Sequence, residues 1–253
     1  MPLPPPPPTF DVRLAAARPL SGSVRELTFE RADGGPIAFQ AGQWMNFVLP
    51  IADRDGIEMR RAYSIASAPA QADIGGGAFQ IAVTRVAEGP GSQFLHALEP
   101  GTTLSAIGPQ GFFTRPRDAA QPSLFIGTGT GVTPLRSMIR DALAHGSRAP
   151  MILVFGVRTE EDCIYRDELA ALAEAHDNFR VEYTLSRPPA SWAAKKGYVQ
   201  THVPALWDEL KAHGGEAPHA YICGLERMVS AVREVLRGPL GADRKQVHSE
   251  RYD

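Results

Sequence analysis

The sequence predicts two structural halves, an all-β half followed by an α/β half. From residue 9 to about residue 115, short strand-like runs are separated by turns rich in Gly, Pro and Asp. Beyond residue 122, continuous apolar strands alternate with segments of helical periodicity. The first pattern is typical of a small antiparallel barrel, and the second of a parallel sheet covered on both faces.

Size and composition bound the possible functions. The chain has 253 residues, 43% hydrophobic and 21% charged residues and a net charge of −2, so charge favours neither a nucleic-acid nor a membrane partner. No apolar run has the length of a membrane span. Residues 1–9 are mostly proline without an apolar core, which indicates a disordered polyproline II tail rather than a secretory signal.

The barrel half contains six expected strands and one helix. The strands are expected at residues 10–16, 24–30, 43–49, 59–66, 79–86 and 103–107. Turns are expected at 33–36, 52–56 and 75–77, and a helix at about 92–98. Residues 116–122 are polar and bounded by prolines, which predicts the linker between a domain at 10–116 and a domain at 117–253.

The second half alternates strands with helices. The strands are expected at residues 123–127, 151–156, 179–185, 219–223 and 246–250. The helices are expected at residues 134–145, 165–175, 201–212 and 225–237, with Asp162 as the N-cap of the second. All-apolar strands with intervening helices favour a doubly wound parallel sheet.

One short run combines a cation, an aromatic ring and a hydroxyl. Arg61, Tyr63 and Ser64 lie on a predicted strand, where alternation places Arg61 and Tyr63 on one face. An arginine binds a diphosphate, a tyrosine covers a conjugated ring, and a serine hydroxyl pairs with a ring nitrogen. The run resembles the Arg-x-Tyr-Ser flavin signature of the ferredoxin–NADP⁺ reductase family. That resemblance implies an FAD-binding Greek-key barrel followed by an NAD(P)-binding α/β domain.

A second segment of the first half suits the flavin diphosphate. Gly91, Ser92 and Gln93 begin a predicted helix, where backbone N–H groups bind anions. The family places its flavin diphosphate at a matching turn, although Ser92 also fits a plain N-cap. The resemblance further implies that Val83 and Thr84, on the preceding strand, run past the flavin.

A glycine-rich turn follows the first strand of the second half. It departs from the dinucleotide fingerprint G-x-G-x-x-G, because Val132 stands where the third glycine is expected. It resembles instead the reductase family's own turn, with Pro134 at the first helical position. The resemblance implies that this turn binds the pyridine nucleotide through Gly129, Thr130, Gly131, Thr133 and Pro134.

Two further segments resemble the family's site for the 2′-phosphate of NADP. They supply Ser186, Arg187, Lys196 and Tyr198, and Lys195 adds a third cation. The pattern favours NADPH, while NADH remains an alternative, since NADH-using relatives can also carry the Ser-Arg pair.

The resemblance places hydride transfer near the last two strands. There, Cys223 and Gly224 approach the nicotinamide, Glu250 shapes that contact with Ser64, and Tyr252 stacks on the flavin. The catalytic residues are therefore expected to be Ser64, Cys223 and Glu250. Asp253 follows Tyr252, whereas the family's plant-type pattern ends in the tyrosine, so stacking of Tyr252 stays open.

The implied function is an FAD-dependent oxidoreductase that moves electrons between NADPH and a separate carrier, a ferredoxin or flavodoxin. Two cysteines, Cys163 and Cys223, are too few for an iron–sulfur cluster and favour a reduced, cytoplasmic setting. The histidines show no metal-ligand spacing, and we expect a monomer without a metal. Three alternatives stay open: an NADH-using reductase component of an oxygenase or desaturase, a non-catalytic flavin-binding module, and ferric-chelate reduction.

Overall fold

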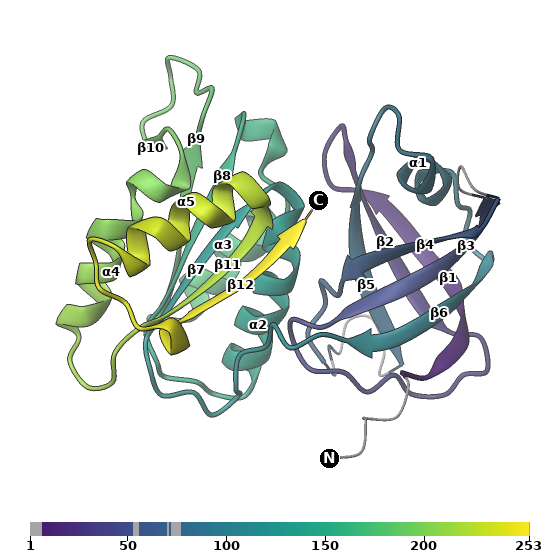
Figure 1. Cartoon of the computed structure of the whole chain (residues 1–253), viewed down its shortest axis with the longest axis horizontal. Helices are drawn as coiled ribbons and strands as arrows, with labels where there is room; N and C mark the ends of the chain where they lie inside the picture. Colours follow the sequence, from purple (N-terminus) through teal and green to yellow (C-terminus); the bar gives the residue numbers. More distant parts are fainter. Residues whose placement is uncertain (1–6, 53–55, 70, 72–76, 253) are drawn as a thin grey trace. The chain divides into compact units, whose positions relative to one another are not determined.

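A computed structural model describes residues 7–52, 56–69, 71 and 77–252 of the chain (Figure 1). Contacts divide the chain into two units. Unit 1 comprises Met1–Thr114 and Arg136–Met138, and unit 2 comprises Arg115–Leu135 and Ile139–Asp253. The expected proline-rich tail at 1–9 and the expected turns at 52–56 and 75–77 lie partly outside the described residues.

Unit 1 is built on an antiparallel sheet, as predicted. In the described residues its strands are β1 (Thr9–Pro19), β2 (Val24–Arg31), β3 (Trp44–Ala52), β4 (Glu58–Ser64), β5 (Ala78–Thr84) and β6 (Thr103–Gln110). Their order in the sheet is β4-β3-β6-β1-β2-β5. The end strands approach each other where the Ala66 N–H donates to Gln80 O at 2.7 Å, so the sheet curls toward a barrel.

The core of unit 1 comes from the inward positions of these strands. Phe29, Phe47 and Phe79 are fully buried, and their ring centroids lie 4.9 to 6.2 Å apart. Such spacing is favourable for aromatic pairs. Phe29 and Phe79 face each other on the neighbouring strands β2 and β5, and Phe47 on β3 joins them from a distant position in the sheet order.

The helix predicted in the barrel half begins earlier than expected. Helix α1 spans Pro90–His96, with Gly89 at the N-cap, so Ser92 is not the N-cap. Pro90 can start the helix because its missing N–H would have no intrahelical acceptor there. Ser92 instead lies in the first turn, where its side chain faces back toward the preceding loop.

Unit 2 is a parallel sheet with intervening helices, as predicted. In the described residues the strands are β7 (Ser123–Thr128), β8 (Met151–Val157), β9 (Phe179–Leu185), β10 (Lys195–Lys196), β11 (His219–Leu225) and β12 (Val247–Tyr252). The helices are α2 (Val132–Ala144), α3 (Arg166–Ala175), α4 (Val203–Ala212) and α5 (Glu226–Arg237), and four short 3-10 turns join the elements of this unit. The order β10-β9-β8-β7-β11-β12 is that of a doubly wound fold.

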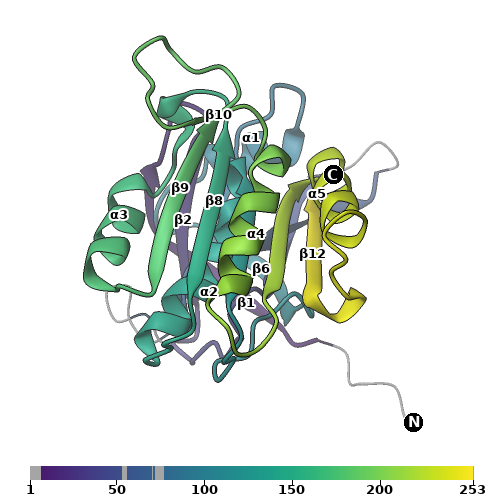
Figure 2. The same cartoon turned by 90° about the vertical axis from the view of Figure 1, so that its left-hand side faces the viewer.

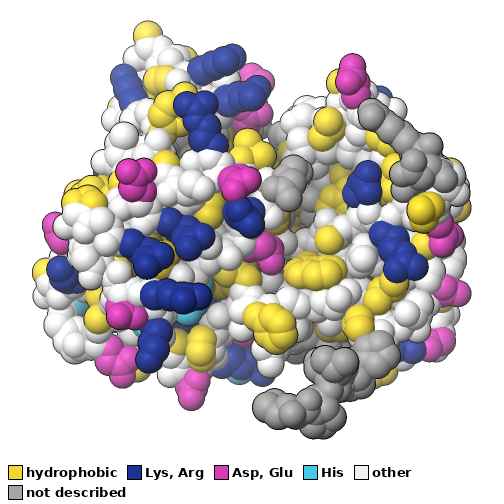
Figure 3. Space-filling model, viewed as in Figure 1, with side chains coloured by type: hydrophobic (Ala, Val, Ile, Leu, Met, Phe, Trp, Pro, Cys, Tyr) yellow, Lys and Arg dark blue, Asp and Glu magenta, His cyan; other side chains and the backbone are white. Residues whose placement is uncertain are grey.

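Helices α4 and α5 pack on one face of this sheet (Figure 2). Buried Leu206 and Trp207 of α4 and Val229 and Val232 of α5 join one core with alternate residues of the central strands. The exposed side of α5 carries Arg227, Arg233 and Arg237 together with Glu226 and Glu234. Figure 3 shows Lys and Arg side chains over this part of the molecule, with Asp and Glu side chains among them. Among the described residues, no helix has the length and apolar character needed to cross a membrane.

Two local expectations for unit 2 were wrong. Helix α2 starts at Val132, so Pro134 is its third residue rather than its first. Asp162 does not cap α3, whose N-cap is Tyr165. Its carboxylate accepts the Thr159 N–H at 3.1 Å and hydroxyl at 3.0 Å, which forms a capping box around the short turn Glu160–Asp162.

The sheet order places a switch point between β7 and β11. From β7 the chain proceeds to β8, β9 and β10 on one side, and it returns to β11 and β12 on the other. Doubly wound sheets bind ligands outside the carboxyl ends of strands at such a point. The loops that follow these strands are therefore where a nucleotide site is expected.

Candidate functional site

The predicted flavin signature lies on β4 of unit 1. Tyr63 is partly buried, and its ring meets Phe47 edge-on at a centroid distance of 6.2 Å. Burial raises the pKa of Tyr63 to about 12, and the nearby charge of Arg61 opposes that shift. Tyr63 therefore stays a neutral phenol with an arginine beside it, and Ser64 follows as a buried residue at the strand end.

The first turn of α1 lies directly beside Arg61. A Cβ added to Gly91 would lie 3.0 Å from Arg61 Cγ and 3.3 Å from the side chains of Leu49 and Met59. The start of the helix thus packs tightly against the stem of Arg61, and a larger side chain at Gly91 would displace its neighbours by a few tenths of an ångström. The N–H groups of a first helical turn lack intrahelical acceptors, so backbone donors lie beside the stem of Arg61, whose guanidinium donates to Arg60 O at 2.7 Å. This is a donor set suited to a diphosphate.

The loop before α1 is braced by its own side chains. Ser92 Oγ donates to Gly89 O at 2.9 Å and accepts the Val86 N–H at 3.1 Å. Gln93 Nε2 donates to Ala87 O. Both polar side chains are therefore occupied, and the Gln93 N–H donates to Gly89 O at 3.0 Å. The backbone N–H groups of Gly91 and Ser92 are the predicted donors of this turn that suit an anion.

Val83 and Thr84 have different environments at the end of β5. The side chain of Val83 is fully buried in the barrel core, and its carbonyl lies 2.8 Å from His96 Nε2. Thr84 is exposed. Of these two residues, only Thr84 presents its side chain outward.

The glycine turn after β7 combines an open position with a closely packed one. Gly129 has a φ of +53°, and no heavy atom lies within 4 Å of a Cβ added there. A Cβ on Gly131 would collide with the carbonyl of Cys223 and lie 2.8 Å from Gly224 Cα. The turn thus packs against the end of β11 through Gly131 and leaves the backbone open to a ligand at Gly129.

Cys223, Thr133 and Tyr252 meet at the same edge of unit 2. Tyr252 Oη lies 3.2 Å from Thr133 Oγ1, whose hydroxyl donates to Thr130 O at 2.8 Å. Burial and the charge of Glu250 raise the pKa of Cys223, against a hydrogen bond from Tyr252 that lowers it. Cys223 therefore remains a thiol at neutral pH, which suits a shaping role rather than a nucleophilic one.

The two segments expected to bind the adenosine end are neighbours in the sheet. Lys196 of β10 pairs with Leu185 of β9, and the Gly197 N–H donates to Leu185 O at 2.8 Å. Arg187 follows β9, and Tyr198 follows β10, so both leave the sheet at the same carboxyl edge. Lys195 differs from the prediction, because its Nζ forms an ion pair with Glu182 at 3.1 Å.

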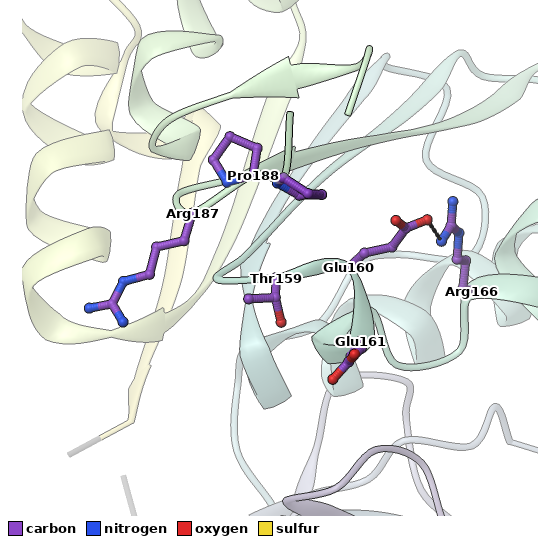
Figure 4. Close-up of a pocket in the computed structure, with 7 residues that line it drawn as sticks. Thr159, Glu160, Glu161, Arg166, Arg187 and Pro188 are labelled. Carbon is purple, nitrogen blue, oxygen red and sulfur yellow. Dashed lines mark hydrogen bonds and ion pairs between the residues drawn. The ribbon is translucent and has the colours of Figure 1, made fainter. Parts of the chain in front are cut away.

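A pocket of about 570 Å³ opens beside Arg187 (Figure 4). Its lining consists of Thr159, Glu160, Glu161, Arg166, Arg187, Pro188 and Pro189. Glu160 and Arg166 form an ion pair, and Figure 4 shows the Arg187 side chain extending away from that pair. The prediction included only Arg187 of these residues. Thr159 and both glutamates follow β8, so their position after a parallel strand was the signal for the site.

The predicted site residues belong to different units. The FAD set, apart from Tyr252, lies in unit 1, and the whole NADP set lies in unit 2. Of the predicted catalytic residues, Ser64 belongs to unit 1, whereas Cys223 and Glu250 belong to unit 2. Each role therefore stays a prediction. Within the described ranges, no group of three or more His, Cys, Asp or Glu side chains is arranged to hold a metal ion.

Comparisons with known protein families match both units. The oxidoreductase FAD-binding domain family matches residues 11–114, and the oxidoreductase NAD-binding domain family matches residues 125–234. Together these ranges contain the flavin signature and the glycine turn.

Individual relatives extend this likeness. The chain is 59% identical over 245 residues to ferredoxin–NADP reductase B of Sorangium cellulosum, which covers 96% of this chain and 98% of the relative. It is 28% identical to the toluate 1,2-dioxygenase electron transfer component of Pseudomonas putida, covering 90% of this chain but 63% of that longer protein.

A solved structure supports the same assignment. The Amycolatopsis cytochrome P450 reductase GcoB matches with a TM-score of 0.79 and 28% identity, covering 97% of this chain and 70% of that one. Combined with the antiparallel barrel, the doubly wound sheet and the near full-length relative, these matches show that the chain belongs to the ferredoxin–NADP reductase family.

Proposed function

We propose that this chain moves electrons between NADPH and a separate one-electron carrier, a ferredoxin or flavodoxin, through bound FAD. The observation that carries the proposal is the pairing of β9 with β10, which sets the Arg187 and Lys196 segments side by side at a nucleotide-binding edge. The high identity to a ferredoxin–NADP reductase supports both the nucleotide and the carrier. We further propose that the FAD domain is 10–116 and the NAD(P) domain 117–253, in a cytoplasmic monomer.

The residues of unit 1 fit an FAD. A Cβ at Gly91 would occupy the space between the first turn of α1 and its neighbours, and the side chain of Arg61 lies beside this turn. Arg61 and the backbone N–H groups of Gly91 and Ser92 would hold the diphosphate, with Gln93 completing this turn and Tyr63 against the ring system. Ser64, Val83, Thr84 and Tyr252 complete the proposed FAD set. When bound, FAD supplies the ability to accept a hydride and to release its electrons one at a time.

The residues of unit 2 fit a pyridine dinucleotide. Gly129 leaves its backbone open, and Thr130, Gly131, Thr133 and Pro134 complete the turn that would hold the diphosphate. Arg187 and Lys196 would neutralise the 2′-phosphate with Ser186 beside them, and Tyr198 would cover the adenine. Cys223, Gly224 and Glu250 would shape the nicotinamide end, where the Cys223 thiol excludes water because it is buried.

The carboxylates of the pocket favour one alternative. Glu160 and Glu161 line the same pocket as Arg187, and only Glu160 is paired there with Arg166. Negative charge near the adenosine end opposes a 2′-phosphate and favours NADH. An NADH-using reductase component of an oxygenase system therefore remains the second candidate, in line with the name of the toluate relative.

Anaerobic titration with NADPH and then NADH separates the two candidates. The flavin absorbance of the FAD-loaded protein should bleach at far lower concentrations of NADPH than of NADH. Subsequent addition of a purified ferredoxin should restore the absorbance as the carrier is reduced. A preference for NADH would favour the oxygenase-type reductase, and absence of bound flavin after addition of FAD would reject both.

A further inference from the structure

The segment Lys195–Tyr198 is held in place by more than its strand pairing. Strand β10 comprises only two residues, at the edge of the sheet. A strand this short forms few ladder hydrogen bonds, so it positions side chains weakly by itself. Nevertheless it carries Lys196 and Tyr198 at the nucleotide edge, where both are exposed, Tyr198 to 65%.

Four consecutive carbonyl oxygens of this segment each contact a polar side-chain atom. The contacts are Trp192 Nε1 to Lys195 O at 2.9 Å, His202 Nε2 to Lys196 O at 3.2 Å, Thr184 Oγ1 to Gly197 O at 2.9 Å, and Thr201 Oγ1 to Tyr198 O at 2.7 Å. Side-chain hydrogen bonds to successive carbonyls fix the backbone of a segment that has little secondary structure. We call Trp192, His202, Thr184 and Thr201 the carbonyl brace.

Thr184 and His202 form the centre of the brace. His202 Nε2 lies 3.0 Å from Thr184 Oγ1, and Thr184 is fully buried. The single Thr184 hydroxyl proton is donated to Gly197 O, so Thr184 Oγ1 must accept from His202. His202 therefore carries its proton on Nε2, the same atom that faces Lys196 O. The Thr184–His202 pair thus holds two successive carbonyls, those of Lys196 and Gly197.

We infer that Thr184 and His202 are positioning residues that preorganise Lys196 and Tyr198 for the adenosine 2′-phosphate of NADPH, which rests on the proposed use of NADPH. Lys196 and Tyr198 extend from a stretch of backbone that cannot shift without breaking the hydrogen bonds made by Thr184 and His202. A ligand that finds its partners already ordered does not lose affinity to ordering them. Because Lys196 would contact only the 2′-phosphate, a loosened backbone would weaken NADPH more than NADH.

The test measures binding rather than turnover. Isothermal titration of the full FAD-loaded chain with 2′,5′-ADP and with 5′-AMP isolates the 2′-phosphate. In H202A and in T184V, the Kd for 2′,5′-ADP should rise about 3- to 10-fold, and the Kd for 5′-AMP about twofold or less. In the K196A background, the same substitutions should raise the Kd for 2′,5′-ADP only about twofold or less, because the effect on the 2′-phosphate acts through Lys196 and only the contribution of Tyr198 remains.

Matched variants separate positioning from general stability. H202Q and T184S keep a donor at each position and should bind close to the wild-type protein. H213A removes another histidine of the same helical region, whose Nδ1 contacts Glu209 O at 3.0 Å, and should leave both affinities unchanged. Should T184V fail to fold, H202A carries the test, because His202 is only half-buried.

The possible failures are distinguishable. If wild-type protein binds 2′,5′-ADP no more tightly than 5′-AMP, the proposed use of NADPH is wrong, whatever the variants do. If the wild-type protein discriminates and H202A and T184V discriminate equally well, the inferred positioning role is wrong. Equal weakening of both nucleotides would also reject it, since that result indicates a general structural role.

Discussion

Among single residues, Gly131 is required by space rather than by backbone angle. Its φ of −62° is accessible to any residue, so no conformational penalty attaches to a larger side chain. A Cβ would nevertheless lie 2.6 Å from the Cys223 carbonyl carbon and 2.8 Å from Gly224 Cα. The turn and the end of β11 can pack together only because this side chain is absent.

We expect G131A to destabilise unit 2 and to weaken binding of pyridine nucleotide. Overpacking against backbone atoms should lower the free energy of unfolding by about 1–3 kcal/mol, measured by chemical denaturation. Gly22 offers the matched control, because no atom lies within 4 Å of a Cβ added there. An unchanged denaturation midpoint in G131A would mean that β11 can withdraw from the turn at little cost.

Arg61 and Arg60 provide a second single-residue comparison. They are neighbours on β4, so their side chains point to opposite faces, and a Cβ on Gly91 would approach Arg61. R61A should raise the Kd for FAD about 10- to 100-fold, since a hydrogen bond to a charged group contributes about 1.5–3 kcal/mol. R60A should leave it unchanged. Quenching of FAD fluorescence measures the Kd for FAD in both variants. Equal effects of R61A and R60A on this Kd would contradict the proposed binding of the diphosphate by Arg61.

At the level of elements, β12 is attached to β11 by a ladder of rings. Phe125, Tyr221 and His248 are paired in register across β7, β11 and β12. Tyr221 stacks on His248 at a centroid distance of 4.8 Å, and His248 Nε2 lies 3.1 Å from His219 Nδ1. A contact this short between two ring nitrogens needs one of them without a proton, so the ladder favours neutral histidines.

The ladder makes the attachment of β12 dependent on pH. Burial lowers the pKa of both His219 and His248, with Arg115 contributing to the first and His219 to the second, while Glu216 opposes the shift of His219. The unfolded chain then binds more protons than the folded chain, so stability is complete above about pH 6.5 and falls as pH decreases below it.

We expect H248F to reduce this dependence while keeping the stack on Tyr221. The slope of unfolding free energy against pH, measured by denaturation between pH 7 and pH 5, should decrease by less than about 1.4 kcal/mol per pH unit, the limit for one proton. H213N replaces an exposed histidine and serves as the comparison. If H213N and H248F changed the pH dependence of the unfolding free energy by the same amount, the ring ladder would not be the source of this dependence.

For the whole molecule, the division into two units predicts that the two ligands stabilise different residues. A ligand at 100 times its Kd adds about 2.7 kcal/mol to the stability of the state that binds it. By hydrogen exchange, FAD should raise protection in Glu58–Ser64 and Pro90–His96 of unit 1. In turn, 2′,5′-ADP should raise protection in Lys195–Lys196 and Val203–Ala212 of unit 2. Protection by 2′,5′-ADP confined to unit 1 would contradict the proposed nucleotide site.

Most of the fold followed from local patterns, but the details of the caps did not. Strand Phe179–Leu185 has the predicted bounds, because its hydrophobic run is bounded clearly on both sides. The two-residue strand β10 was missed, since two residues show no periodicity. Asp162 was assigned to the wrong cap because Thr159, three residues earlier, competes for its carboxylate and closes a separate turn.

By itself, the sequence determined the order of strands and helices, the glycine turn after β7 and the Arg-x-Tyr-Ser run, because each depends on residues adjacent in the chain. Only the tertiary structure decided that Gly131 meets Cys223 and that His202 and Thr184 brace the segment carrying Lys196. These contacts join residues distant in the chain, and they exist only once the sheet order is set. Periodicity predicts which face of a strand is buried, but it contains no information about which strand lies beside it.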